Sequence, residues 1–354
     1  MGDIKKKNKI SSYKLIDLLK FICAFLVIGI HTRPFQARNN LLDQFFYYDI
    51  SNYAVPFFYA CTGYFLIIKQ SGEDLHTKLM LRCKKILKMY LIWSAIYIPL
   101  TLVGWIIEGE RKLVYLLLCL RNFVFVGDNF YSWTLWYLNG LIFALILLDI
   151  LSKRLSIRKI VGIGSFTYLI GIGLTMLNGH LESLPSFFEK PIDLYFSLFV
   201  TTRNGLFQSL VFVAIGMLIA QKDSTNELKL CKKDGLFMGG IYIVKVGLSL
   251  MGGGQCFTQI LDLPTFWFLF EIIIYTCRKV NFKGMFYKQL RDMSETIYFV
   301  HMYLVAFCSL VLYKGDYHNF KSYFICTGGA VTIALFCQIC KNKKLKIRCL
   351  PSVH

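Results

Sequence analysis

The sequence predicts an all-α, polytopic membrane protein with about ten transmembrane helices. Of its 354 residues, 56% are hydrophobic, and the mean hydropathy of the chain is positive. Apolar runs of about 17 to 25 residues recur along it, and a run of that length crosses the roughly 30 Å hydrocarbon core as a helix. A soluble chain of this length would not need so many such runs.

Each expected span is an apolar run that ends where the chain becomes polar or charged. The first five are 15–31, 50–68, 86–107, 132–151 and 157–177. The other five are 205–221, 235–251, 257–277, 295–313 and 322–340. The run 113–126 is short and carries Arg121, so we expect an interfacial or re-entrant piece there. The chain then comprises a basic tail (1–14), one membrane domain (15–340) and a second basic tail (341–354).

Basic residues test the orientation of this topology, because short cytoplasmic connections carry an excess of Lys and Arg. With the N-terminus in the cytoplasm, the inner segments hold 29 of the 40 Lys and Arg residues and the outer segments hold 9. The remaining two, Lys20 and Lys245, lie within spans. The asymmetry predicts a multi-pass protein of the cell membrane with both termini in the cytoplasm.

The same distribution explains the formal net charge of +19. In a soluble protein such an excess of basic over acidic residues would suggest a nucleic-acid partner. Here the basic residues are spread over every inner segment, so topology and anionic lipid account for them. We expect membrane lipid as a partner and no nucleic acid. The basic segment KKKNK precedes an apolar run without a small-residue cleavage site, so we expect the first helix to be retained.

The cysteines and histidines do not indicate a metal site. The twelve cysteines are scattered, mostly within spans, and the pair Cys337 and Cys340 falls inside the last one. Buried small hydrophobic side chains are the simpler interpretation. The six histidines are also too scattered to argue for metal binding.

The first span, IDLLKFICAFLVIGIH, contains ionisable residues that are costly in a bilayer. Lys20 and His31 are eleven residues apart, so they share one face of a helix at a separation of roughly 16 Å along its axis. A structural alternative stays open: Lys20 could reach the inner interface and pair with Asp17, while His31 could be an ordinary helix-end residue.

Five motifs in this order resemble those of the integral-membrane acyltransferase family three, whose members acylate hydroxyl groups of surface glycans. The first is the Lys-x10-His spacing in the first span. The others are VPFFYACTGYFL (55–66, with Thr62 where serine is usual), RCKKILKMY (82–90, with Lys85 in place of arginine), LWYLNGLI (135–142) and SETIYFVH (294–301). The resemblance runs from about residue 13 to 340.

The resemblance implies transfer of an acyl group, with acetyl the first expectation, from cytoplasmic acyl-coenzyme A to a hydroxyl of a carbohydrate or other cell-envelope acceptor. Lys20 and His31 would be catalytic, with His31 taking the hydroxyl proton, which suits a side chain with an ordinary pKa near 6.5. Arg82 and Lys85 would bind coenzyme A phosphates, although the positive-inside rule explains them almost as well. Acyl-coenzyme A would be a co-substrate, and no permanently bound cofactor is expected.

Other polar residues would line the path. Ser294, Tyr298 and His301 share a helix face, and the resemblance places them in the same cavity, although hydrogen bonds between helices are the alternative. Asp17 would line the cavity and orient Lys20. Glu271, alone in its span, would either pair with Lys245 or titrate. Trp133, Trp136 and Tyr137 look like an aromatic belt at the membrane interface.

A second resemblance leaves the function open. The chain is also similar to the membrane half of vancomycin-resistance type serine/alanine racemases, which begins with a short basic tail and IDLLKFI. Lysine at positions 20 and 85 also removes the bidentate contacts that arginine would make. The alternative function is therefore a transporter-like or anchoring membrane module for a small amino acid such as serine.

Overall fold

The computed structural model describes residues 13–69, 72–108, 112–129, 131–251, 255–280, 284 and 286–342. Within these ranges the regular secondary structure is helical and contains no β-strand, as the sequence predicts. Each of the ten apolar runs falls on helical segments. The two expected basic tails lie mostly outside the described residues.

Thirteen α-helices are described in these ranges. The first seven are α1 (Lys14–Thr32), α2 (Asn40–Gln44), α3 (Ala54–Ile68), α4 (Leu75–Glu108), α5 (Lys112–Arg121), α6 (Trp136–Ser152) and α7 (Ile157–Asn178). The others are α8 (Ser186–Phe199), α9 (Leu210–Ser224), α10 (Lys232–Leu250), α11 (Gln255–Lys279), α12 (Phe286–Phe307) and α13 (Phe320–Asn342). Short π or 3-10 turns extend several of them: η1 (Phe45–Ile50), η2 (Ser51–Tyr53), η3 (Asn122–Val126), η4 (Trp133–Leu135), η6 (Gly205–Ser209) and η7 (Cys308–Leu312).

In the described part of the chain, eight helices are long and apolar enough to cross a membrane. They are Lys14–Thr32, Leu75–Ile107, Trp133–Ser152, Ile157–Asn178, Gly205–Ser224, Thr258–Lys279, Phe286–Leu312 and Phe320–Lys341. The expected spans 50–68 and 235–251 are not among them. α3 has only 15 residues, and α10 carries charges at its start and at Lys245. The expected short piece at 113–126 is a shorter apolar helix.

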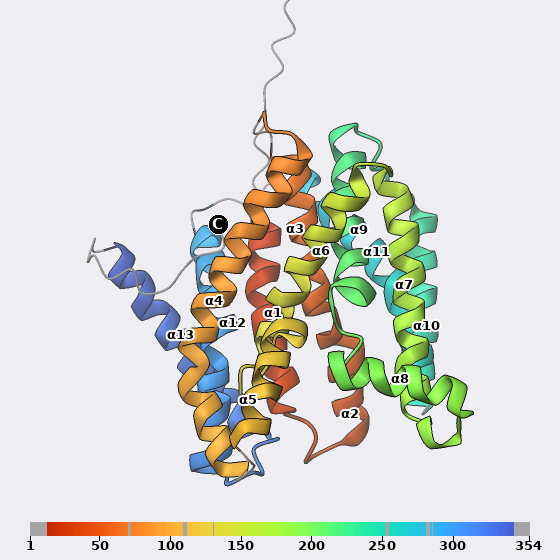
Figure 1. The fold of residues 1–354 in the computed structure, drawn as a ribbon. Helices are drawn as coiled ribbons and strands as arrows, with labels where there is room; N and C mark the ends of the chain where they lie inside the picture. The colour runs from red at the N-terminus through yellow and green to blue at the C-terminus, as the bar shows by residue number, and fades with distance from the viewer. Residues whose placement is uncertain are drawn as a thin grey trace, which may run out of the picture.

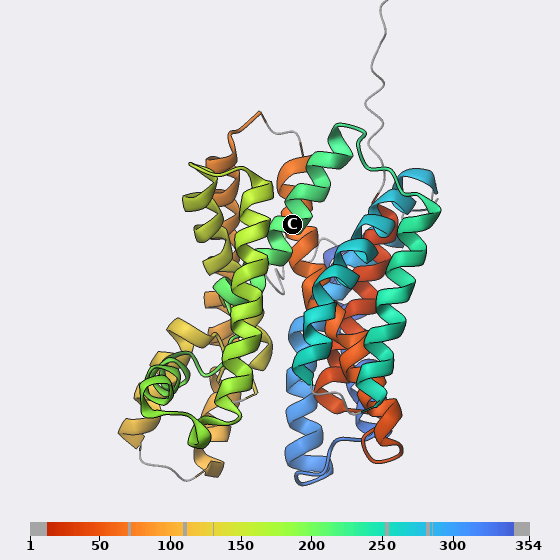
Figure 2. The same cartoon turned by 90° about the vertical axis from the view of Figure 1, so that its right-hand side faces the viewer.

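The helices run between two ends of the molecule. The connections that follow α3, α6 and α9 lie together at the upper end in Figure 1, whereas α2 and α8 lie toward the lower end. We call the upper end the basic end, because its connections are among those that hold the excess of Lys and Arg. In Figure 2, α7 and α8 lie toward one side and α10 and α12 toward the other. That the basic end faces the cytoplasm stays a prediction.

Between these two sides, α3 and α9 pack closely because each contributes a glycine at the contact. A Cβ atom at Gly63 would lie 1.9 Å from the Val213 carbonyl oxygen, and one at Gly216 would lie 2.0 Å from that of Ala60. Small residues let membrane helices approach at backbone distance, where dispersion and weak polar contacts hold them together. This contact fixes α3, whose side chains help to form the site.

The first helix packs within the group of helices that lies on the right in Figure 2. α1 contacts α3, α11, α12 and α13, and its contact with α12 is extensive. Ile16, Ala24 and Ile28 are fully buried on this helix. The same helix contributes Lys20 and His31 to the walls of two internal cavities.

Candidate active site

A cavity of about 100 Å³ surrounds the end of Lys20, nearer the basic end of α1; we call it the Lys20 cavity. Side chains from α1, α3, α4, α6 and α12 form its wall. They are Lys20, Phe58, Thr62, Arg82, Met89, Tyr137, Arg291, Ser294, Glu295, Tyr298 and Phe299. All five motifs named from the sequence therefore contribute side chains to one space.

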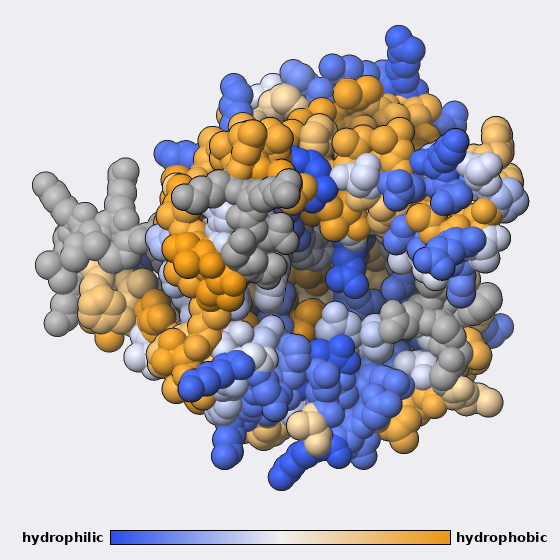
Figure 3. Space-filling model, turned by 60° about the horizontal axis from the view of Figure 1, so that its bottom comes forward, coloured by the Kyte–Doolittle hydropathy of each residue, from blue (hydrophilic) through white to orange (hydrophobic). Residues whose placement is uncertain are grey.

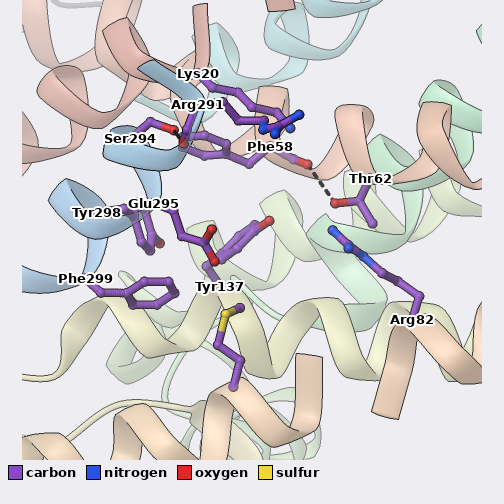
Figure 4. A pocket seen from close by; sticks show the side chains of 11 residues that line it. Lys20, Phe58, Thr62, Arg82, Tyr137, Arg291, Ser294, Glu295, Tyr298 and Phe299 are labelled. Carbon is purple, nitrogen blue, oxygen red and sulfur yellow. Dashed lines mark hydrogen bonds between the residues drawn. The ribbon is translucent and has the colours of Figure 1, made fainter. Parts of the chain in front are cut away.

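Three cationic side chains line this cavity. In Figure 4, Lys20 and Arg291 carry their charged ends to the same part of the space, and Arg82 enters from α4 toward Thr62. Lys20 Nζ also lies 5.3 Å from the centre of the Phe65 ring, a cation–π contact. Such a cluster suits a ligand with several negative charges, and guanidinium groups bind phosphate oxygens in pairs.

Sequence reasoning missed Arg291 and Glu295 as site residues. Arg291 entered only the count of basic residues, yet it precedes Ser294 by three positions and Tyr298 by seven. That spacing places it on the helix face already assigned to the cavity. The Ser294 hydroxyl donates a hydrogen bond to the Arg291 carbonyl oxygen at 2.7 Å, so Ser294 is held within its own helix.

A second cavity, of about 460 Å³, lies around His31 at the other end of α1; we call it the His31 cavity. Its polar and aromatic lining includes His31, Tyr47, Tyr48, Asn52, Asp128, Trp133, Thr134, Trp136, Thr201, Arg203, Gln208, Gln259 and Tyr298. Burial raises the pKa of Asp128 to about 6, although the charge of Arg121 lowers it. Figure 3 shows that the lower end of the molecule is hollowed at its centre, with many hydrophilic side chains around the hollow.

His31 is held between two aromatic partners. Its ring stacks on Trp133 with centroids 6.0 Å apart and contacts the ring of His301 with centroids 5.4 Å apart. His301 is fully buried, and its Nδ1 lies 3.2 Å from the Ile297 carbonyl oxygen, to which it can only donate. Its Nε2 is then an acceptor, and it finds no hydrogen-bond partner in the described residues.

Tyr298 belongs to the wall of both cavities. Its hydroxyl donates a hydrogen bond to the Thr134 carbonyl oxygen at 3.1 Å, which ties α12 to the turn before α6. The two spaces thus meet at one side chain. Lys20 and His31, on the same helix, line the two spaces on either side of that meeting point.

Five of the site residues predicted from the sequence line at least one of the two cavities. Lys20, Arg82, Ser294 and Tyr298 line the Lys20 cavity and His31 lines the second one. Asp17, Lys85 and His301 are not in either wall. Asp17 lies in the first turn of α1, Lys85 is a half-buried residue of α4, and His301 is buried against the ring of His31. The catalytic and binding roles of all these residues stay predictions.

The aromatic-belt interpretation of Trp133, Trp136 and Tyr137 is wrong. Trp133 and Trp136 line the His31 cavity, and Tyr137 lines the Lys20 cavity. The turn before α6 and the start of α6 approach α12, so these rings point into the molecule. A sequence pattern of aromatic residues near a span end does not distinguish these two orientations.

The expected pair of Glu271 with Lys245 is also wrong. Glu271 Oε1 accepts from Lys222 Nζ at 2.7 Å, at the basic end of α9. Lys245 instead contacts Asp49 and Asp262, each with an N–O distance of 2.9 Å. Asp49 comes from η1, a segment far from α10 in sequence, so local spacing could not identify it as the partner.

A third space of about 220 Å³, the side cavity, adjoins the His31 cavity. The two share Asn52, Thr201, Arg203, Gln208 and Gln259, and Asp262 belongs to the side cavity alone. In the described part of the chain, no three His, Cys, Asp or Glu side chains are grouped to hold a metal ion. The features that bear on ligand binding are therefore cavities, charges and hydrogen-bonding groups.

The family model described as an acyltransferase domain matches residues 13–339. An amino-acid racemase of Enterococcus faecalis is 27% identical over 96% of this chain and 47% of its own length, and a second from the same organism is 32% identical over 57% of this chain and 28% of its own length. A serine/alanine racemase of Enterococcus gallinarum is 26% identical over 83% of this chain and 41% of its own length.

The chain spans less than half the length of these curated relatives, so the activity in their names is that of longer proteins. No solved structure matches the chain. The family match, by contrast, covers nearly the whole sequence and includes each helix that lines the two main cavities. The chain belongs to the family of membrane proteins defined by this acyltransferase domain.

Proposed function

We propose that the protein transfers an acyl group, with acetyl the first candidate, from acyl-coenzyme A to a hydroxyl of an extracytoplasmic acceptor. The donor enters from the basic end and the acceptor from the opposite end. One observation carries the proposal: Lys20 and His31 on α1 line separate cavities that meet at Tyr298. A donor and an acceptor supplied from opposite sides of a membrane need this arrangement.

The Lys20 cavity has the charge that a coenzyme A donor requires. Phosphate oxygens bind best to guanidinium groups, which donate two parallel hydrogen bonds. Lysine at position 20 cannot make that bidentate contact, but Arg82 and Arg291 line the same cavity. The diphosphate of the donor would lie near these residues, and its pantetheine arm would extend along α1 toward His31.

The His31 cavity has a group that suits proton removal. A neutral imidazole takes the proton of the acceptor hydroxyl as its oxygen attacks the thioester carbonyl carbon. The C–S bond then breaks, coenzyme A leaves as the thiolate, and His31 returns the proton to the sulfur. Contacts with Trp133 and His301 hold the ring in place for both steps.

Donor binding is the first test. The purified protein in lipid nanodiscs should bind acetyl-coenzyme A, and Arg82→Ala should weaken that binding by about ten- to a hundredfold, the effect of losing one charge-assisted contact. Lys222→Ala is the matched control, because Lys222 is a basic residue near the same end that pairs with Glu271 outside the cavity. If the wild-type protein does not bind coenzyme A compounds, the proposed function is contradicted.

A second candidate function is favoured by the names of the relatives, which are amino-acid and serine/alanine racemases. The chain would then be a membrane module that takes up or presents a small amino acid such as serine. Vesicles that contain the protein would accumulate labelled serine, and the purified protein would not bind acetyl-coenzyme A. Acyl transfer without serine accumulation would exclude this candidate.

A further inference from the structure

A buried ionic cluster lies beside the side cavity. The Lys245 side chain on α10 is 1% exposed, and its ammonium nitrogen lies 2.9 Å from both Asp49 Oδ1 and Asp262 Oδ1. The same nitrogen donates a hydrogen bond to the Tyr48 carbonyl oxygen at 2.9 Å and lies 4.9 Å from the centre of the Tyr53 ring. One cation is therefore shared by two carboxylates.

When both carboxylates are ionised, the cluster carries one negative charge more than Lys245 neutralises. The side chains of Asp49 and Asp262 are 0% and 5% exposed, so water screens neither carboxylate well. Asp49 Oδ2 has no hydrogen-bond partner within the described ranges. An uncompensated charge within a membrane protein is costly and points to a proton, an ion or a cationic ligand.

Asp262 is the carboxylate of this cluster that can meet a ligand, because it lines the side cavity. Its Oδ2 accepts a hydrogen bond at 2.7 Å from Asn52, and Asn52 lines both the side cavity and the His31 cavity. Gln208 also lines both, and its buried Oε1 has no hydrogen-bond partner among the residues that the structure describes. An acceptor without a donor thus faces the space that Asp262 lines.

We infer that the side cavity receives the ammonium group of a hydroxyl-bearing acceptor, with Asp262 as its counter-ion and the hydroxyl directed toward His31. The inference rests on the proposed function and deepens it by naming the class of acceptor: a small compound or terminal group with both a hydroxyl and a primary ammonium. An ammonium group adds the positive charge that the cluster lacks. It can donate hydrogen bonds to the Asp262 carboxylate and to the side-chain Oε1 of Gln208.

Two sources supply this chemistry, an amino sugar and a hydroxy amino acid. Arg203 lines both cavities, so the carboxylate of an amino acid would have a cationic partner there. An amino sugar would make no use of that charge. Arg203→Gln therefore separates the sources, since it weakens binding of the amino acid only.

The experiment measures binding to the full chain in nanodiscs without an acyl donor, using glucosamine against glucose and L-serine against glycerate. At least one amine should bind about tenfold or more tightly than its amine-free counterpart. Asp262→Asn should lower that affinity by about ten- to a hundredfold. Glu271→Gln, a carboxylate-to-amide change on the same helix, should leave it unchanged, because Glu271 pairs with Lys222 away from the cavity.

Equal binding of amines and amine-free compounds by the wild-type protein would overturn the inference, as would an amine preference that persists in Asp262→Asn. If that variant does not elute as a folded protein, Asn52→Leu replaces it. Leucine cannot donate the hydrogen bond that holds the Asp262 carboxylate, so this variant should reduce the preference. If the protein binds the amines but not acetyl-coenzyme A, the result would support the ammonium site and contradict the proposed acyltransferase function.

Discussion

His31 and His301 contact each other between α1 and α12, with their ring centroids 5.4 Å apart. The hydrogen bond from His301 Nδ1 to the Ile297 carbonyl oxygen fixes which nitrogen of His301 carries the proton. The other nitrogen is left as an acceptor, buried and within the same helix pair as His31. In the described residues this nitrogen has no hydrogen-bond partner. We predict that it accepts the N–H of His31 when the acceptor is bound, which leaves the second nitrogen of His31 to take a proton.

This contact predicts that His301→Leu lowers kcat and leaves the KM for the donor unchanged. Losing one hydrogen bond of ordinary strength corresponds to roughly a three- to tenfold effect. His301→Gln should retain more activity than His301→Leu, because an amide oxygen also accepts a hydrogen bond. Equal kcat values in the two variants would show that His301 only fills space.

The cations of the Lys20 cavity predict that Arg291→Ala weakens acetyl-coenzyme A binding. Removing one charge-assisted contact costs about 1.5 to 3 kcal/mol, or about ten- to a hundredfold in affinity. Lys288→Ala is the control, because Lys288 is an exposed residue of the same helix that does not line the cavity. Titration calorimetry on both variants would decide whether Arg291 holds the donor, and equal affinities would contradict that role.

The α3–α9 contact predicts that Gly216→Ala destabilises the protein. The new Cβ would lie 2.0 Å from a backbone oxygen, so the two helices must separate, at a cost of about 1 to 3 kcal/mol. Gly240→Ala on α10 meets nothing within 4 Å and should be neutral or slightly stabilising, because alanine favours helices. Thermal unfolding in detergent compares the two, and similar melting temperatures would contradict the close packing.

The buried ionic cluster predicts that Lys245→Met is strongly destabilising. Two carboxylates would then face each other without a cation, which costs about 3 to 5 kcal/mol. Asp49→Asn should cost less, because it leaves Lys245 paired with Asp262 as a neutral unit. The order of the two melting temperatures checks the charge count, and the reverse order would refute it.

Much of the fold could be predicted from the sequence because long apolar runs have few alternatives in a membrane. The boundaries of the expected span 50–68 were harder to predict. The helical segments α2, η1 and η2 lead directly into α3, so the start of the span is not marked by a loop. Helical periodicity also brought Ser294, Tyr298 and His301 to one face of α12. It would have found Arg291 as well if basic residues near span ends had not been assigned to orientation alone.

The rest of the site depends on contacts between distant segments, which periodicity does not encode. Asp49 meets Lys245 only because η1 lies against α10. Arg203 and Asp128 reach the His31 cavity from connections whose paths the sequence does not reveal. Trp133, Trp136 and Tyr137 lie near the end of a span but line the cavities, so their position along the chain did not show which way their rings point.

The rate of acyl transfer in His31→Ala, measured with radiolabelled acetyl-coenzyme A at saturating donor, tests the central claim most directly. The account predicts a folded protein with unchanged donor affinity and a transfer rate lower by about 10² to 10⁴, the effect of losing a general base. Lys20→Ala, in the same preparation, should instead weaken donor binding. Full transfer activity in His31→Ala would contradict the account, because the residue on the acceptor side of α1 would then take no part in the chemistry.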